Sequence, residues 1–231
     1  MQLQARVGEV QKPANTALSS ALKGALITFT PIGFFVIEGL DGSGKSTQSR
    51  LLHEHLSKRH KAVLTTEPTD GFIGKQIREL LRSGQPLDPE TRQLMFVADR
   101  ANHVNTFIKP MIAKGNIVVS DRYFFSTIAY GVATGLDKSW IMDMHRIFPM
   151  PDATFVIDLD PKTALERIAR RGQNLEIFEK VALQTKIRAE YLALQKNYKR
   201  YFIIDGNRDA ETISKEIIGI AEKILANAPI V

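Results

Sequence analysis

Eight consecutive residues have the types and spacing that can hold a polyphosphate. The segment Gly39-Leu40-Asp41-Gly42-Ser43-Gly44-Lys45-Ser46 follows the pattern G-x-x-x-x-G-K-[ST]. Its glycines allow backbone angles that turn successive N–H groups toward phosphate oxygens, and a helix beginning there adds the positive end of its dipole. We expect Lys45 to contact the outer phosphates and to pack against nothing else. The Ser46 hydroxyl can bind Mg²⁺.

A carboxylate and a guanidinium follow a second apolar run. Ile117-Val118-Val119-Ser120-Asp121-Arg122 places Asp121 at the end of a buried strand. Because nucleotides bind at the carboxyl edge of an open α/β sheet, Asp121 is predicted to hold Mg²⁺ through water. Arg122 can bind a second phosphate through two parallel hydrogen bonds. Asp158 and Asp160 are a competing metal candidate, ranked lower because no arginine accompanies them before Arg167.

Two further groups are individually weaker signals. Phe96 and Arg100 are four residues apart in an expected helix, so they share a face that can stack on a flat base and bind its edge. The alternative is that Phe96 belongs to the packing core. Arg167, Arg170 and Arg171 can form a cationic flap that neutralises charge on a transferring phosphoryl group. The alternative is a solvated helix end.

Strand-length apolar runs alternate with helical patterns from Pro31 onward, which predicts an α/β sandwich with a mainly parallel sheet. The expected strands are Phe34–Ile37, Ala62–Leu64, Ile117–Val119, Thr154–Ile157 and Tyr201–Ile204. The expected helices are Thr47–Arg59, Pro89–Lys109, Ser139–Ile147, Ala164–Arg171, Phe178–Tyr198 and Ala210–Ala226. Residues 1–31 are acid-poor and predict an extension that is either disordered or a short helix.

Composition excludes several classes of protein. The 231 residues contain no cysteine, which excludes a disulfide scaffold, a cysteine nucleophile and a thiolate zinc site and fits a cytoplasmic protein. The longest uncharged run, Gly24–Ile37, is too short to cross a membrane. The net charge of +6 suits phosphorylated ligands, but no basic cluster beyond Arg170-Arg171 supports nucleic-acid binding. No N-K-x-D segment reads guanine, which argues against a regulatory GTPase.

Four motifs together resemble the thymidylate kinase family of P-loop nucleoside-monophosphate kinases. They are Gly39–Thr47, Thr66-Glu67-Pro68, Phe96-x-x-x-Arg100 and Asp121-Arg122-Tyr123, in the family's order and approximate spacing. The likeness runs from about Phe34 to Leu225. It implies a P-loop NTPase three-layer sandwich with a five-stranded parallel sheet, in one kinase domain over residues 32–231 with a lid near residues 167–179.

The resemblance also implies an activity. ATP and dTMP would give ADP and dTDP in dTTP synthesis, with Mg²⁺ and usually in a homodimer. The alternative is a P-loop kinase of another nucleoside monophosphate or small acceptor. The implied metal site is Ser46 and Asp121. The implied ATP site is Gly39, Asp41, Gly42, Ser43, Gly44, Lys45, Ser46 and Thr47.

The implied dTMP site takes residues from all four motifs: Asp41, Glu67, Pro68, Phe96, Arg100, Arg122, Thr127 and Tyr130. In the family pattern, Asp41 holds the 3′-hydroxyl and Arg122 holds the phosphate. Tyr130 lies where an aromatic ring crowds the 2′ position.

The base has its own set of implied contacts. Phe96 stacks on thymine, Arg100 bonds its edge and Thr127 lies at a polar contact to it.

Two positions bear on catalysis in the family pattern. Some members carry a basic residue where this chain has Gly42, and others supply an arginine from the lid; this chain resembles the second kind. Thr66 replaces an arginine that is common in the family. The groups expected to surround the transferring phosphoryl are Lys45, Arg122 and a lid arginine, Arg170 or Arg171.

Overall fold

A parallel sheet forms the centre of the described part of the chain. The computed structural model describes residues 33–170 and 177–227, so the predictions on residues 1–31 and on Arg171 lie outside the described residues. Five strands pair in the order β2-β3-β1-β4-β5, and every pairing is parallel. They are β1 (Phe34–Gly39), β2 (Ala62–Thr66), β3 (Ile117–Asp121), β4 (Ala153–Asp158) and β5 (Tyr201–Asp205).

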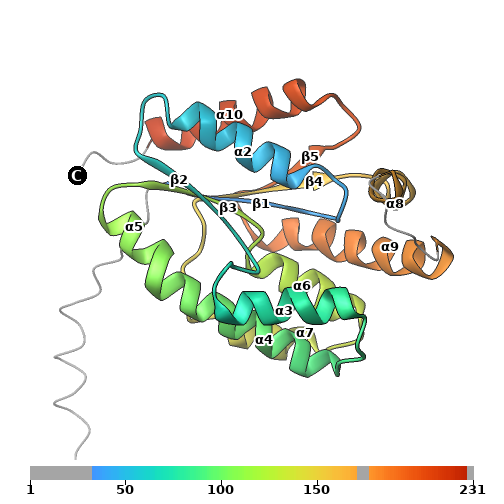
Figure 1. The fold of residues 1–231 in the computed structure, drawn as a ribbon. Coiled ribbons are helices and arrows are strands. Elements are labelled where there is room, and N and C mark those ends of the chain that lie inside the picture. Colours follow the sequence, from blue (N-terminus) through green and yellow to red (C-terminus); the bar gives the residue numbers. More distant parts are fainter. Residues whose placement is uncertain (1–32, 171–176, 228–231) are drawn as a thin grey trace, which may run out of the picture. The chain divides into compact units, whose positions relative to one another are not determined.

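Helices cover both faces of this sheet (Figure 1), as expected. One face carries α2 (Lys45–Leu56) and α10 (Ala210–Ala226). The other carries α3 (Phe72–Ser83), α4 (Pro89–His103), α5 (Lys109–Ala113), α6 (Phe124–Ala133), α7 (Lys138–His145) and α9 (Ile177–Leu194). Two short helices, η2 (Val104–Ile108) and η3 (Gln195–Asn197), follow α4 and α9, and α8 (Pro161–Ala169) follows β4. Within the described ranges, no helix is both long and apolar enough to span a membrane.

Alternate residues of the central strand supply the two cores. Phe34 and Val36 are buried in the core shared with α6 and α9, whereas Phe35 and Ile37 are buried in the core shared with α2 and α10. Covering on both faces explains why the first four residues of β1, Phe34–Ile37, are an unbroken apolar run in the sequence.

The sequence prediction lacked two helices, α3 and α6, and it ended at the first residue of a third, α5. Helix α6 is buried on almost every side, so its apolar residues show no amphipathic period. Helix α3 begins after Gly71 and contains Gly74, and glycine lowers the helix propensity of this otherwise amphipathic segment. A Cβ at position 74 would lie 2.0 Å from the carbonyl oxygen of Thr69. The close packing of the preceding loop therefore requires glycine at position 74.

Candidate active site

The loop between β1 and α2 is shaped by its glycines. Gly39, Gly42 and Gly44 all have positive φ, at 140°, 84° and 101°. A Cβ at position 42 would lie 2.3 Å from the carbonyl oxygen of Ala164 at α8. This contact leaves no space for a basic side chain at position 42, so a second cation for the phosphates has to come from another segment.

Lys45 is more enclosed than the sequence predicted. It is buried, and its Nζ donates to the Leu40 carbonyl at 2.7 Å and lies 3.6 Å from Asp41 Oδ1. The expectation that Lys45 packs against nothing is therefore wrong, because α2 draws its first residue against the loop. Burial and the nearby Arg122 charge lower the pKa of Lys45 to about 8. A phosphate that replaced the Leu40 carbonyl would meet a preorganised cation.

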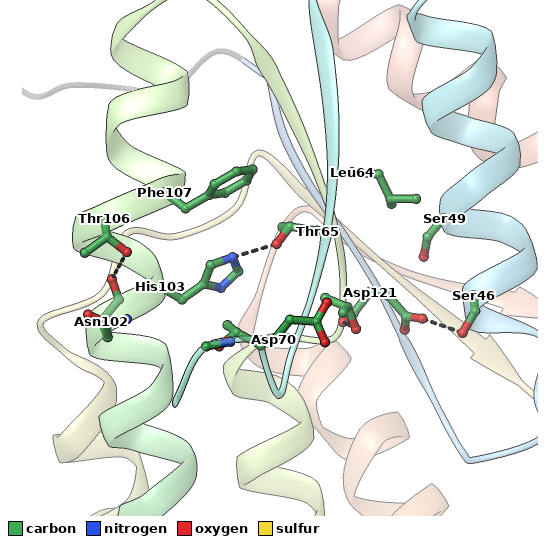
Figure 2. Close-up of a pocket in the computed structure, with 13 residues that line it drawn as sticks. Ser46, Ser49, Leu64, Thr65, Asp70, Asn102, His103, Thr106, Phe107 and Asp121 are labelled. Carbon is green, nitrogen blue, oxygen red and sulfur yellow. Dashed lines mark hydrogen bonds between the residues drawn. The ribbon is translucent and has the colours of Figure 1, made fainter. Parts of the chain in front are cut away.

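Ser46 and Asp121 meet as predicted, at the ends of different elements (Figure 2). Ser46 Oγ at the start of α2 donates to Asp121 Oδ2 at the end of β3, at 2.5 Å. The other carboxylate oxygen, Oδ1, is buried and has no partner among the described residues. Hydroxyl and carboxylate oxygens are the donors that Mg²⁺ prefers. The pair thus fits a Mg²⁺ ion that takes its remaining ligands from phosphates and water.

The competing metal candidate has other roles. Arg188 of α9 donates to both oxygens of Asp158, at 2.6 and 2.9 Å. Asp160 is the N-cap of α8 and accepts from the backbone N–H groups of Lys162 and Thr163. The lower ranking of this pair as a metal site agrees with these contacts, because both oxygens of Asp158 and one oxygen of Asp160 already accept hydrogen bonds.

A cavity of about 660 Å³ opens beside the Ser46–Asp121 pair (Figure 2). Its lining comes from α2, β2, the β2–α3 loop, β3, α4 and η2: Ser46, Ser49, Leu64, Thr65, Thr66, Thr69, Asp70, Gly71, Asn102, His103, Thr106, Phe107 and Asp121. Thr66 donates to the Asp121 carbonyl at 3.2 Å. Thr66, a short side chain, therefore borders the open cavity beside the Ser46–Asp121 pair.

Arg122 joins the phosphate loop to β3. Its Nη1 donates to Ser126 Oγ at 2.8 Å, and its Nη2 pairs with Asp41. Tyr130 donates to the second oxygen of Asp41 at 3.1 Å. The Arg122 charge holds the pKa of Asp41 well below its usual range. Arg122 also has a φ of 74°, a strained conformation that these contacts hold in place.

Glu38, which the sequence analysis missed, holds Ser126, the residue that accepts from Arg122. It is fully buried, and its Oε1 accepts the backbone N–H groups of Tyr123 and Ser126 at the start of α6. Its Oε2 accepts Ser126 Oγ at 2.5 Å and Tyr191 Oη at 3.0 Å. Burial raises the pKa of Glu38. An acidic residue in an otherwise apolar strand was the available signal.

A second buried guanidinium lies at the other end of the site. Arg100 of α4 pairs with Glu67 Oε2, and its Nη1 donates to Thr127 Oγ1 at 2.9 Å and to His145 Nε2 at 2.8 Å. Glu67 also accepts from His103 Nδ1 at 2.9 Å. The structure thus brings Glu67, Arg100 and Thr127 together as predicted. Glu67 contacts the Arg100 guanidinium directly.

The remaining predicted residues lie around these two groups. Phe96 is partly buried on α4, and Pro68 is partly buried and follows a cis peptide bond. The loop after Pro68 is fixed to α4, because Asp99 accepts from the backbone N–H and hydroxyl of Thr69. Thr47 is partly buried in the first turn of α2. Arg170 is exposed at the C-cap of α8.

Comparison with known proteins gives this geometry a family. The sequence model described as "Thymidylate kinase" matches residues 37–217. The chain belongs to the thymidylate kinase family. That range contains every candidate site residue from Gly39 to Arg171, so phosphate loop, Arg122 and Arg100 all fall within the family's own pattern.

Relatives in this family are similar along most of their length. A "Probable thymidylate kinase" of Thermococcus kodakarensis is 41% identical over 83% of this chain and 98% of its own. Another of Methanococcoides burtonii is 37% identical over 88% of this chain and 99% of its own. A "Thymidylate kinase" of Onion yellows phytoplasma is 40% identical over 78% of this chain and 92% of its own.

Proposed function

We propose that this chain transfers the γ-phosphoryl group of ATP to dTMP, giving ADP and dTDP. The observation that carries the proposal is the contact between Arg122 and Asp41. Asp41 belongs to the loop that binds the donor's phosphates, and Arg122 is the candidate ligand of the acceptor's phosphate. Donor and acceptor phosphates therefore converge on one point, as an in-line transfer requires. Membership of the thymidylate kinase family supports the same reaction.

The chemistry needs placement and charge rather than a general base. An oxygen of the dTMP phosphate is already ionised at neutral pH, so it attacks the γ-phosphorus directly while the bond to the β-phosphate oxygen breaks. Lys45 and Arg122 hold the negative charge that spreads over the transferring group. Arg170 is a proposed further donor at the end of α8. Mg²⁺ bound at Ser46 and Asp121 would neutralise charge on the β- and γ-phosphates.

The acceptor is selected by groups around its sugar and base. Tyr130 lies beside Asp41 and is proposed to crowd the 2′ position of the sugar. Burial raises the pKa of Tyr130, so its hydroxyl stays neutral. Phe96, Arg100 and Thr127 are proposed to meet the base. Among the rival acceptors, ribonucleotides would clash at Tyr130.

We further propose that the chain works as a homodimer. Helices α3 and α4 pack side by side (Figure 1) and expose Phe72, Leu81 and Leu94 to 81%, 55% and 49%. Large apolar side chains exposed on two neighbouring helices favour a protein partner. Sedimentation equilibrium should give about twice the chain mass of 25.9 kDa. The double variant Phe72→Glu, Leu94→Glu should sediment as a monomer, whereas Ile147→Glu, a control at an exposed residue elsewhere, should not. A monomeric wild type contradicts the proposal.

The proposed reaction is tested by its stoichiometry. Purified protein with ATP, Mg²⁺ and dTMP should form ADP and dTDP in equal amounts, resolved by ion-exchange chromatography. Without dTMP, ADP formation should fall to background. ADP release that is independent of dTMP would mean hydrolysis rather than transfer, and would contradict the proposal.

A further inference from the structure

The guanidinium of Arg100 is held on three sides by three different elements. It is 1% exposed and carries five N–H groups. Nε and Nη2 each lie 2.7 Å from Glu67 Oε2, which follows β2. Both hydrogens of Nη1 are used, one on Thr127 of α6 and one on His145 of α7. Within the described residues, one N–H of Nη2 remains for a ligand.

The hydrogen-bond pattern fixes the protonation state of His145. Its Nδ1 lies 2.6 Å from the carbonyl oxygen of Ile141, a group that can only accept, so Nδ1 carries the hydrogen. Its Nε2 lies 2.8 Å from an Arg100 nitrogen that can only donate, so Nε2 carries the lone pair. Burial, with the Arg100 charge beside it, lowers the pKa of His145 to about 3. The imidazole is therefore neutral and acts as an acceptor toward Arg100.

We infer that His145 is a positioning residue for acceptor recognition, because its neutral imidazole fixes the rotation of the Arg100 guanidinium. This inference rests on the proposed function, in which Arg100 meets the base of dTMP. With Nη1 fully bonded, the guanidinium offers a single N–H on Nη2. A base must then present an acceptor there, as the 4-carbonyl of a pyrimidine does and an exocyclic amino group does not.

Among the described residues, the other side chains that face Arg100 here are aromatic rings, which replace the imidazole acceptor poorly. The rings of Tyr123 and Phe148 lie 5.3 and 6.0 Å from the Arg100 Cζ atom, and the ring of Phe124 lies 5.5 Å from that of His145. Aromatic faces stabilise the cation but accept hydrogen bonds poorly. Without the imidazole, an Nη1 hydrogen would be buried and unpaired, which is costly, and Arg100 would rotate to satisfy it.

The role of His145 is separable from simple packing by a conservative substitution. His145→Leu keeps apolar volume and removes the acceptor. His145→Gln keeps an acceptor for Arg100 and a donor for the Ile141 carbonyl. His60→Leu makes the first change at an exposed histidine and serves as the matched control. For each folded variant we would measure kcat and KM for dTMP and for ATP, and kcat/KM for dCMP.

The expected pattern is selective. His145→Leu should raise the KM for dTMP by about 10- to 100-fold, the loss of a hydrogen bond to a charged group, with the KM for ATP unchanged. The preference for dTMP over dCMP should fall by a similar factor, and His145→Gln should restore most of both. A folded His145→Leu enzyme with a wild-type KM for dTMP would overturn the inference. An equal rise in the KM for dTMP and in the KM for ATP, in both His145→Leu and His145→Gln, would also overturn it. Failure of wild type to use dTMP would instead refute the proposed function.

A spectroscopic measurement on the wild-type protein tests the geometry without any variant. Long-range ¹H–¹⁵N spectra of the imidazoles should show His145 as the neutral Nδ1–H tautomer, unchanged between about pH 5 and pH 8. A His145 signal that titrates near the ordinary histidine pKa would contradict its place as an acceptor for Arg100.

Discussion

Tyr130 shows how one side chain can act through both its volume and its hydroxyl. The ring is proposed to exclude a 2′-hydroxyl, and the hydroxyl donates to Asp41. Tyr130→Ala should raise kcat/KM for UMP relative to dUMP by about tenfold or more, because steric exclusion is lost. Tyr130→Phe should keep the discrimination and lower kcat/KM for dTMP by only about 2- to 13-fold, the value of one neutral hydrogen bond. Unchanged sugar discrimination in Tyr130→Ala would show that another residue excludes the ribose.

Asp121 ends β3 and Asp158 ends β4, on either side of β1, and they offer a matched pair of carboxylates. One oxygen of Asp121 has no hydrogen-bond partner in the described part of the chain, whereas both oxygens of Asp158 accept from Arg188. Asp121→Asn should raise the Mg²⁺ concentration for half-maximal activity by about 10- to 100-fold. Asp158→Asn should lower stability and leave the Mg²⁺ requirement unchanged. Titration of initial rates with Mg²⁺ measures both, and the reverse pattern would move the metal to Asp158.

Residues in linear motifs could be predicted from the sequence, whereas most residues that support them could not; Glu38, an acidic residue in an apolar strand, is the one that carried a signal. Lys45, Asp121 and Arg122 stand in short patterns whose chemistry is legible from spacing alone. His145 stands in no such pattern. It lies 45 residues from Arg100 in the sequence, and only the tertiary packing of α7 brings the two side chains together. Burial of Lys45 was likewise unpredictable, since it depends on where the Leu40 carbonyl points.

At the scale of elements, α7 contributes stability that depends on pH. His145 at its C-terminal end is buried and neutral, and its pKa is lowered from 6.5 to about 3. The unfolded chain therefore binds a proton below about pH 6.5 that the folded chain does not. This component of the free energy of unfolding is complete above that pH and is lost as the pH falls. Per pH unit, the loss approaches about 1.4 kcal/mol.

His145→Gln should remove that dependence. Urea unfolding between about pH 7 and pH 5 should show a shallower loss of stability in the variant than in the wild type. His60→Leu, at an exposed histidine, should follow the wild-type slope. Parallel curves for His145→Gln and the wild type would mean that His145 protonates normally in the folded protein.

The elements easiest to predict from the sequence are those whose burial leaves a simple pattern, either fully buried or buried on one face. Buried strands contain continuous apolar runs, such as Phe34–Ile37 of β1, and α10 has the predicted bounds, Ala210–Ala226. Helix α6 was missed because burial on nearly all sides removes the periodic signal. Yet α6 carries Ser126, Thr127 and Tyr130 to the site. Helices that carry site residues inside the core are thus the least visible from spacing.

For the whole molecule, two guanidinium groups at fixed places predict one acceptor preference. Arg122 would hold the acceptor's phosphate and Arg100 would hold its base, with Glu38 and His145 fixing them from behind. These supports come from β1, α6, α7 and α9, so the site depends on the entire described fold rather than on the phosphate loop alone.

The most direct test is a competition in one vessel. Equimolar dTMP, dUMP, UMP, CMP and AMP are incubated with limiting ATP that is labelled at the γ-phosphate, and the labelled diphosphates are separated at early times. Product ratios then report the ratios of kcat/KM. The account predicts dTDP as the dominant product, with dUDP next and the ribonucleotide products minor. Dominant labelling of CDP or of AMP-derived ADP would contradict the assignment of dTMP as the acceptor.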